Sequence, residues 1–305
     1  MAKVKTFKTI FPAVSVPLND DYSINEPEFR AYLRWIKTFY GKGMDGLVCN
    51  GHTGEITGLT RAERKRVVEI CAEECGDVMT IISGVNCENT AESIEMAKEA
   101  KEAGADGILL MPPHMWLRFG MNPDAPFEYV KDVAEGADID IIIHLYPATS
   151  KAFYPVETLI KMCKEIDHVK CIKMGTRVTS IYEHDVRLLR QECPDISLIT
   201  CHDETLCVSW FPGMDGALIG FAGCVPEIIC PAREVFANPD KHTLKEAQDW
   251  SDRIYHISQA IYGGGQPSGE AHARLKEALK QRGIFSSALM RKPVLPLNQE
   301  EKDWV

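Results

Sequence analysis

One lysine lies in the middle of a run of apolar residues. In the segment VKCIKMGT, residues 169–176, Lys173 follows Cys171 and Ile172 directly. A lysine buried without a partner is costly, and the usual relief is a lowered pKa that leaves a neutral amine. Because a neutral amine is a nucleophile, this segment predicts amine chemistry at Lys173. The structural alternative is an outward lysine that snorkels between helices.

Two other segments place polar residues directly after apolar runs. In GHTGE, residues 51–55, a glycine-rich turn follows such a run. The amides of His52 and Thr53, with the Thr53 hydroxyl, are therefore expected to hold a carboxylate or phosphate. A plain tight turn is the alternative there. Tyr146, just before Pro147, is either a core tyrosine or a proton donor near the lysine.

Eight apolar runs alternate with amphipathic, helix-like segments along the chain. The runs cover residues 13–18, 46–51, 80–85, 107–113, 140–147, 169–175, 197–202 and 216–221. Buried parallel strands are near-continuous apolar runs, so this pattern predicts an α/β fold, a (β/α)8 TIM barrel over residues 1–236. Two more helices, at about 240–262 and 269–283 and separated by a flexible loop at 263–269, predict a C-terminal helical extension over 237–305.

The barrel brings the polar segments together. Active sites of such barrels lie at the C-terminal ends of the strands and on the loops that follow. Because side chains alternate along a strand, His144 and Tyr146 share one face, as do Cys171 and Lys173. If that face is the barrel interior, the lysine amine lies in a dry cavity near the mouth.

Composition and charge exclude several classes of partner. The chain has 305 residues, of which 45% are hydrophobic, and a net charge of −10 without any basic block, which argues against a nucleic-acid partner. No apolar run has the length of a membrane span, and the N-terminus lacks a signal peptide, so a cytoplasmic location is expected. The 11 cysteines contain no CxxC pair and are expected to be reduced thiols.

Together these segments resemble the dihydrodipicolinate synthase and N-acetylneuraminate lyase superfamily. GHTGE resembles that family's G-T-T-G-E, LYPATS its Y-N-V-P stretch, and CIKMGT its G-I-K-[DE]-[AST]-[ST]. Residues 84–113 resemble its third and fourth strand region, and residues 291–301 resemble its usual ending. The resemblance covers essentially the whole chain in the expected order.

The resemblance implies a class I lyase that acts on pyruvate or another 2-oxo acid and an aldehyde, without metal or cofactor, as a homotetramer. Lys173 would form the Schiff base, and the iminium would serve as the electron sink. Tyr146 would relay protons. His52 and Thr53 would bind the 2-oxo acid's carboxylate.

Three departures from the synthase concern the second substrate. His114 stands where the synthase has a tyrosine donated by a neighbouring subunit, His52 replaces a threonine, and Lys151 replaces an arginine that receives a carboxylate. The segment PPHMW, residues 112–116, is instead similar to the V-P-M-W of hydratase-aldolases. That similarity implies that Trp116, with Met115 and Phe153, shapes a pocket for an apolar or aromatic aldehyde. Ordinary packing is the alternative for Trp116.

Other functions remain open at this point. Dihydrodipicolinate synthesis and action on a 2-oxo-3-deoxy sugar acid are the alternatives within the superfamily. A metal-dependent barrel enzyme would need three ligands from the polar residues near strand ends, which are His52, His114, His144, His202, Asp203 and Glu204. However, no HxH or HExxH spacing is present. A non-catalytic binding homologue is disfavoured because Lys173, Tyr146 and Thr53 are all present.

Overall fold

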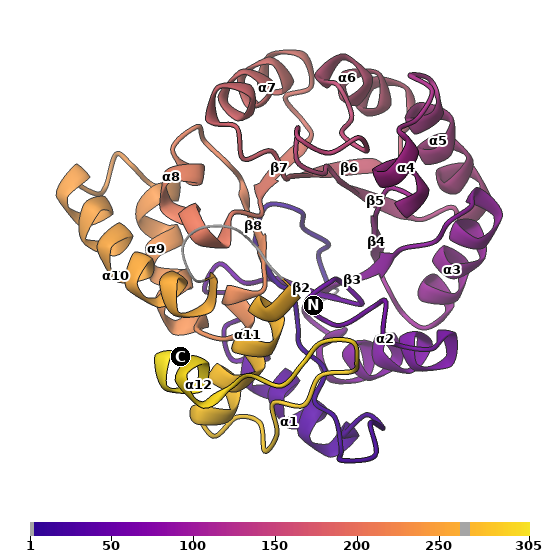
Figure 1. The fold of residues 1–305 in the computed structure, drawn as a ribbon. Helices are drawn as coiled ribbons and strands as arrows, with labels where there is room; N and C mark the ends of the chain where they lie inside the picture. Colours follow the sequence, from indigo (N-terminus) through magenta and orange to yellow (C-terminus); the bar gives the residue numbers. More distant parts are fainter. Residues whose placement is uncertain (1–2, 263–268) are drawn as a thin grey trace.

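The computed structural model describes residues 3–262 and 269–305, in which eight parallel strands form one sheet. The sheet order is β1-β8-β7-β6-β5-β4-β3-β2, and the N–H of Val14 donates to Val48 O at 2.9 Å to link the two edges. The result is the predicted (β/α)8 barrel, nearly closed and surrounded by helices (Figure 1). The strands are β1 Ile10–Pro12, β2 Gly46–Cys49, β3 Thr80–Val85, β4 Gly107–Leu110, β5 Asp140–His144, β6 Val169–Met174, β7 Ser197–Thr200 and β8 Gly216–Ile219.

The helices form a ring outside the strands and continue beyond the barrel. The ring consists of α1 Glu26–Lys37, α2 Arg61–Cys75, α3 Thr90–Glu102, α4 His114–Phe119, α5 Ala125–Ala137, α6 Val156–Glu165, α7 Thr179–Glu192, α8 Leu206–Trp210 and α9 Pro226–Ala237, with short turns η1 Asp203–Thr205 and η2 Phe221–Gly223. The extension contains α10 Leu244–Tyr262, α11 Gly269–Gln281 and α12 Gln299–Trp304. The first two are the predicted extension helices. The loop predicted at 263–269 lies, except for Gly269, outside the described residues. A domain boundary at residue 236 stays an interpretation.

The first strand differs from its prediction. The run at residues 13–18 was expected to form it, but β1 is Ile10–Pro12, and Ala13 makes only an isolated bridge to Val48. Pro17 has no N–H to donate to a sheet ladder. Its carbonyl instead accepts from the amide of Asn25, which ties this segment to the start of α1. The run is therefore buried chain between a strand and a helix.

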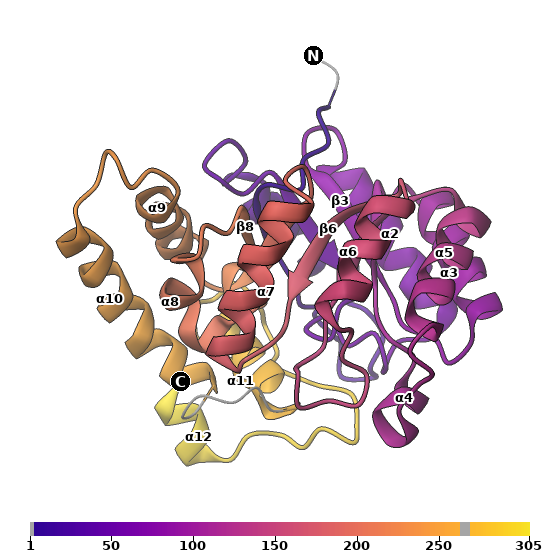
Figure 2. The same ribbon diagram turned by 90° about the horizontal axis from the view of Figure 1, so that it is seen from above.

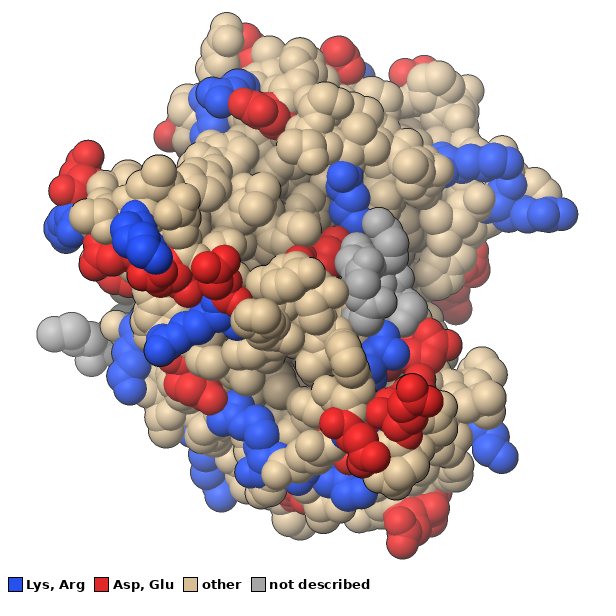
Figure 3. Space-filling view, turned by 60° about the vertical axis from the view of Figure 1, so that its left-hand side comes forward, with Lys and Arg blue, Asp and Glu red and all other residues tan. Residues whose placement is uncertain are grey.

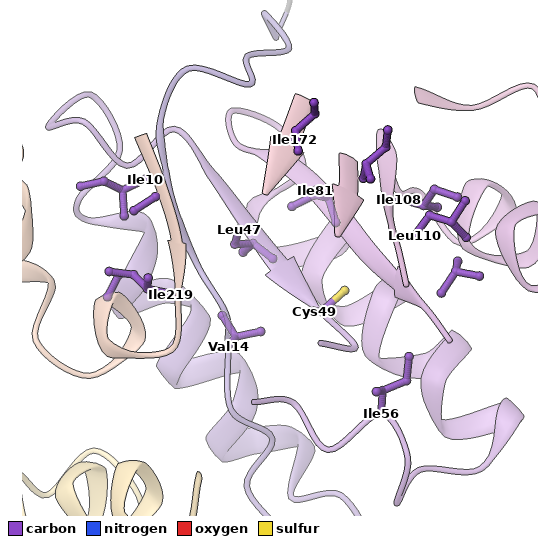
Figure 4. Close-up of a cluster of buried hydrophobic side chains, with 14 of the residues drawn as sticks. Ile10, Val14, Leu47, Cys49, Ile56, Ile81, Ile108, Leu110, Ile172 and Ile219 are labelled. Carbon is purple, nitrogen blue, oxygen red and sulfur yellow. The ribbon is translucent and has the colours of Figure 1, made fainter. Parts of the chain in front are cut away.

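Alternate residues of the strands fill two separate cores. Figure 4 shows the outer core, where side chains such as Leu47, Ile81 and Ile172 pack between strands and helices. The residues between them fill the barrel interior, among them Val48, Ile82 and Cys171. Because Lys173 follows Cys171 by two residues, its side chain enters the barrel interior, above this apolar floor.

A buried ion pair fastens the extension to the barrel. Lys276 of α11 is 1% exposed and contacts the Glu55 carboxylate, which also accepts from the amide of Arg291 at 2.9 Å. The Lys276 ammonium also donates to Leu289 O at 2.8 Å. Figure 2 shows α11 at the same end of the barrel as α4, opposite the N-terminus. The pair therefore positions α11 over the end of the barrel where the strands stop.

Three features of the structure bear on predictions from composition: the surface charge, the apolarity of the helices and the state of the cysteines. On the face drawn in Figure 3, acidic and basic side chains are interspersed. Within the described ranges, no helix combines the length and apolarity that crossing a membrane requires. All 11 cysteines are free, as predicted.

We predict that Lys276→Met will lower the free energy of unfolding by about 3–5 kcal/mol, because it leaves the buried Glu55 carboxylate without its cation. Chemical denaturation measures the loss. The exposed pair between Lys245 and Asp249, with side chains 74% and 58% accessible, provides the control. Lys245→Met should change stability by less than about 1 kcal/mol. Equal effects of the two substitutions would contradict the structural role of Lys276.

Candidate active site

A cavity of about 680 Å³ opens at the C-terminal ends of the strands. Its walls come from the β2–α2 turn, the ends of β5 and β6, the segment after β7, and helices α4, α10 and α11. This is where catalytic residues of such barrels gather. The polar residues in its lining are His52, Thr53, His114, His144, Tyr146, Thr149, Lys173, Arg177, Asp203, Tyr262 and His272.

Lys173 reaches into this cavity from β6. Its amine lies 3.2 Å from Nε2 of His144, and within the described ranges no carboxylate forms an ion pair with it. Burial lowers the pKa of the Lys173 amine, and Arg177 adds to this effect, while Cys201 and Asp203 oppose it. Compared with a lysine in water, the cavity therefore shifts this amine toward its neutral form.

Three histidines around the lysine are held neutral. Burial is the main cause, and it lowers the pKa of His52 to about 3 and that of His272 to about 4. The pKa of His144 lies well below its usual value for the same reason. In all three, the nearby Lys173 amine is the next largest cause. The cavity therefore offers hydrogen-bonding imidazoles without adding positive charge.

Tyr146 lies beside these histidines at the end of β5. Its hydroxyl is 3.4 Å from Nε2 of His52, and its ring meets the His144 ring edge-on at 4.9 Å. Burial raises the pKa of the Tyr146 phenol, so the hydroxyl keeps its proton at neutral pH. Tyr146 therefore presents a protonated hydroxyl to the cavity, adjacent to the histidine that contacts Lys173.

The β2–α2 turn presents a candidate anion site. Thr53 is 9% exposed and lines the cavity. Within residues 3–262 and 269–305, the amides of His52 and Thr53 donate to no backbone carbonyl. Gly220 lies so close that a Cβ there would be 3.0 Å from the Thr53 hydroxyl. The two amides are thus without a backbone partner among the described residues, and their role in holding an anion stays a prediction.

Two predicted second-substrate residues lie away from the cavity lining. Trp116 packs its ring against Tyr129 and Tyr154, with centroids 5.6 and 6.2 Å apart, which is the ordinary packing alternative. Lys151 is exposed and donates to the carbonyl of Arg118 at 3.1 Å. Both residues follow strands, but the turns after those strands direct their side chains elsewhere. His114 does line the cavity.

The polar residues considered as metal ligands are dispersed. Glu204 pairs with Arg177 at 2.5 Å, and Asp203 accepts from the amide of Phe221 at 2.8 Å. His202 packs against the Tyr182 ring at 4.9 Å. Among the residues that the structure describes, no three His, Cys, Asp or Glu side chains are grouped to hold a metal ion. The geometry gives the metal-dependent alternative no ligand set.

Some cavity residues were missed as site residues. His272 comes from α11, about 100 residues beyond Lys173 in the chain, and nothing in its helix sets it apart. Arg177 follows β6, where its position at a strand end was an available signal, and Asp203 was considered only as a metal ligand. The pairing of His144 with Lys173 could have been found too, because β5 and β6 are neighbouring strands.

Comparisons with known proteins support the assignment from sequence. The family model described as the dihydrodipicolinate synthetase family matches residues 6–305. The chain belongs to this family. It is therefore an aldolase-type lyase, and the resemblance stated from the sequence is confirmed.

Relatives in this family are distant but match over their full length. The 4-hydroxy-tetrahydrodipicolinate synthase of Bartonella bacilliformis is 26% identical over 97% of this chain and 95% of its own. An uncharacterized DapA-like lyase of Thermofilum pendens is 25% identical over 94% and 91%, respectively. The crystal structure of the E. coli K12 prophage protein YagE, in complex with pyruvate, has a TM-score of 0.87 at 21% identity, covering 98% of this chain and 96% of that one. The Aquifex aeolicus dihydrodipicolinate synthase has a TM-score of 0.84 at 19% identity, covering 97% and 95%.

We predict that Asp203→Asn will make the free energy of unfolding less dependent on pH between pH 4 and 7. Burial raises the pKa of the Asp203 carboxyl to about 7 from 3.8. The folded protein keeps a proton that the unfolded chain releases near pH 4, so raising the pH from 4 to 7 favours unfolding. Asparagine keeps an oxygen for the Phe221 amide but does not titrate.

From pH 4 to 7 the wild-type protein should therefore lose about 3 kcal/mol of unfolding free energy relative to the variant. Denaturant titrations of both proteins at each pH measure it. A constant difference across this range would contradict a protonated Asp203 in the folded state.

Proposed function

We propose that the protein is a Schiff-base lyase that makes or breaks a C–C bond between pyruvate, or a pyruvate-derived 2-oxo acid, and an aldehyde. The observation that carries this proposal is the Lys173 amine, which lines the cavity without a carboxylate ion-pair partner among the described residues and whose pKa is lowered by burial. Such an amine attacks the 2-oxo carbon, and the resulting iminium accepts the electron pair of the breaking bond. No metal ion is needed for that step.

The carboxylate of the 2-oxo acid binds at the β2–α2 turn in this proposal. The Thr53 hydroxyl and the amides of His52 and Thr53 would donate to it. The turn and Lys173 line the same cavity, so an acid held there presents its carbonyl to the amine. The solved YagE structure contains pyruvate, which supports a 2-oxo acid as the first substrate in this fold.

The second substrate is an aldehyde with an apolar or aromatic body. Support comes from Leu117 and Val178, which line the cavity and are 40% and 38% exposed. With Pro147 they offer apolar surface on which a ring or alkyl group is buried. His114 also lines the cavity, with its Nε2 3.2 Å from the Asn86 side-chain nitrogen. Trp116 and Lys151 are assigned no direct contact.

A polyhydroxylated aldehyde from a 2-oxo-3-deoxy sugar acid is the second candidate. Thr149, Asp203 and Tyr262 in the cavity lining favour it, because each can exchange hydrogen bonds with hydroxyl groups. Dihydrodipicolinate synthesis has less support. The position of Lys151 outside the lining leaves no cation there for the semialdehyde's carboxylate, and Arg177 is already paired with Glu204.

The homotetramer and the cytoplasmic location stay predictions from the resemblance. Exposed apolar side chains support an assembly, since such groups on a surface often mark protein contacts. They include Leu117, Phe119, Val208 and Phe211.

We predict that borohydride reduction in the presence of pyruvate will attach a lactate-derived mass to the peptide containing Lys173. Peptide mass spectrometry detects it. Lys173→Arg should abolish both adduct and activity, because a guanidinium stays protonated and does not attack. Lys170→Arg is the matched control, since Lys170 is exposed on the same strand and should leave the adduct intact. An adduct on another lysine, or none, would refute the assignment.

We further predict that condensation of pyruvate with benzaldehydes will outrun condensation with aspartate semialdehyde. The apolar wall at Leu117 and Val178 favours a ring through its burial. Parallel assays with benzaldehydes, aspartate semialdehyde and 2-oxo-3-deoxy sugar acids, read by product mass, provide the comparison. Leu117→Asp should reduce the aromatic reaction more than imine formation with pyruvate. Preference for the semialdehyde would refute the aromatic assignment, and preference for the sugar acid would establish the second candidate.

A further inference from the structure

His144 holds a particular position relative to the nucleophile. The parallel strands β5 and β6 pair His144 with Lys173 in register, and both side chains point into the cavity. Nε2 of His144 lies 3.2 Å from the Lys173 amine. Over the described parts of the chain, no other side chain is within hydrogen-bonding distance of that amine. This imidazole is therefore placed to accept a proton from the lysine nitrogen.

The surroundings of His144 keep it in its neutral form. The titratable and charged groups around it are Lys173 on β6, Tyr146 beyond the end of its own strand, His52 on the β2–α2 turn and Arg177 after β6. None of these is a carboxylate that would stabilise an imidazolium. Its Nδ1 is buried and has no hydrogen-bond partner among the described residues.

A neutral imidazole has one N–H and one lone pair. When the neutral amine donates to Nε2, the lone pair of the amine nitrogen stays free to attack a carbonyl. The unpaired Nδ1 then carries the imidazole proton. In this arrangement Nε2 is a base in contact with the reacting nitrogen.

We propose that His144 is a catalytic residue that removes the proton from the Lys173 nitrogen during imine formation. This inference rests on the proposed function and goes beyond it, because it assigns to His144 a proton transfer that the resemblance implies for Tyr146. The two residues divide the work. The Tyr146 hydroxyl, 3.4 Å from His52, serves the substrate oxygen, and His144 serves the lysine nitrogen.

The protons balance in this scheme. Attack of the Lys173 lone pair on the 2-oxo carbon forms a C–N bond and leaves a positive nitrogen with two protons and a negative oxygen. His144 Nε2 takes one proton from the nitrogen and returns it to the oxygen. The C–O bond then breaks as the Tyr146 hydroxyl gives the second proton, so water leaves. The products are an iminium that keeps one proton on nitrogen, and a Tyr146 phenolate beside it.

Two variants separate proton transfer from positioning. His144→Gln can still accept a hydrogen bond from the amine but is not a base, and His144→Ala leaves room for added imidazole. The rate of imine formation with pyruvate is measured by quenching with borohydride at successive times across a pH series. His202→Asn, which alters a buried histidine outside the cavity, is the matched control.

We expect both His144 variants to form the imine at least about a hundredfold more slowly, as is typical for the loss of a general base. Pyruvate affinity should be kept, and the control should match the original protein. Imidazole should restore the rate of His144→Ala, and more so as the pH rises through 7 and more of the added imidazole is neutral. A merely structural role would not produce this rescue.

The experiment distinguishes failure of the role of His144 from failure of the proposed function. Imine formation by His144→Gln at the original rate, or no response of His144→Ala to imidazole, would refute the role of His144 and leave the proposed function standing. Absence of any imine between pyruvate and the unaltered protein would refute the proposed function itself.

Discussion

The site depends on placing a lysine amine inside the barrel mouth without an ion-pair partner among the described residues. The amine of Lys173 lies at the mouth of a barrel whose interior is filled by apolar side chains such as Ile142 and Leu218. A carboxylate in contact would raise the pKa of that amine and suppress its nucleophilicity. The cavity uses imidazoles instead, and burial keeps these neutral as well. These imidazoles therefore supply hydrogen bonds without stabilising the ammonium form, whereas Cys201 and Asp203 favour that form.

The turn between β2 and α2 serves two purposes in the site. In residues 51–55, His52 and Thr53 face the cavity, whereas Glu55 pairs with Lys276 in the extension. The backbone of Glu55 has φ +57°, the left-handed conformation that lets the chain reverse direction over so few residues. Because α11 also carries His272 into the cavity, the ion pair outside the cavity fixes a wall of the site inside it. The extension is thus part of the site.

Much of this arrangement could be predicted from sequence, because burial leaves a direct mark on composition. Seven of the eight apolar runs contain the observed strands, whereas the run at 13–18 lies directly after β1. Lys173 could be found because a charge in an apolar strand is conspicuous. Trp116 and Lys151 were assigned by analogy, and the direction of a side chain after a strand depends on a turn geometry that composition does not encode. His272 could not be found, since it reaches the site only through the packing of α11.

Proton transfer at this site is built from a single chain. The family resemblance assigns part of that task to a tyrosine from a neighbouring subunit, and this chain has His114 in its place. The His144 and Tyr146 rings meet edge-on with centroids 4.9 Å apart, and the Tyr146 hydroxyl lies 3.4 Å from Nε2 of His52. Together with the Lys173 contact at 3.2 Å, these side chains place three groups that can exchange protons around the nucleophile. On the proposed mechanism, imine formation therefore depends on the barrel itself and does not require a residue from a second subunit.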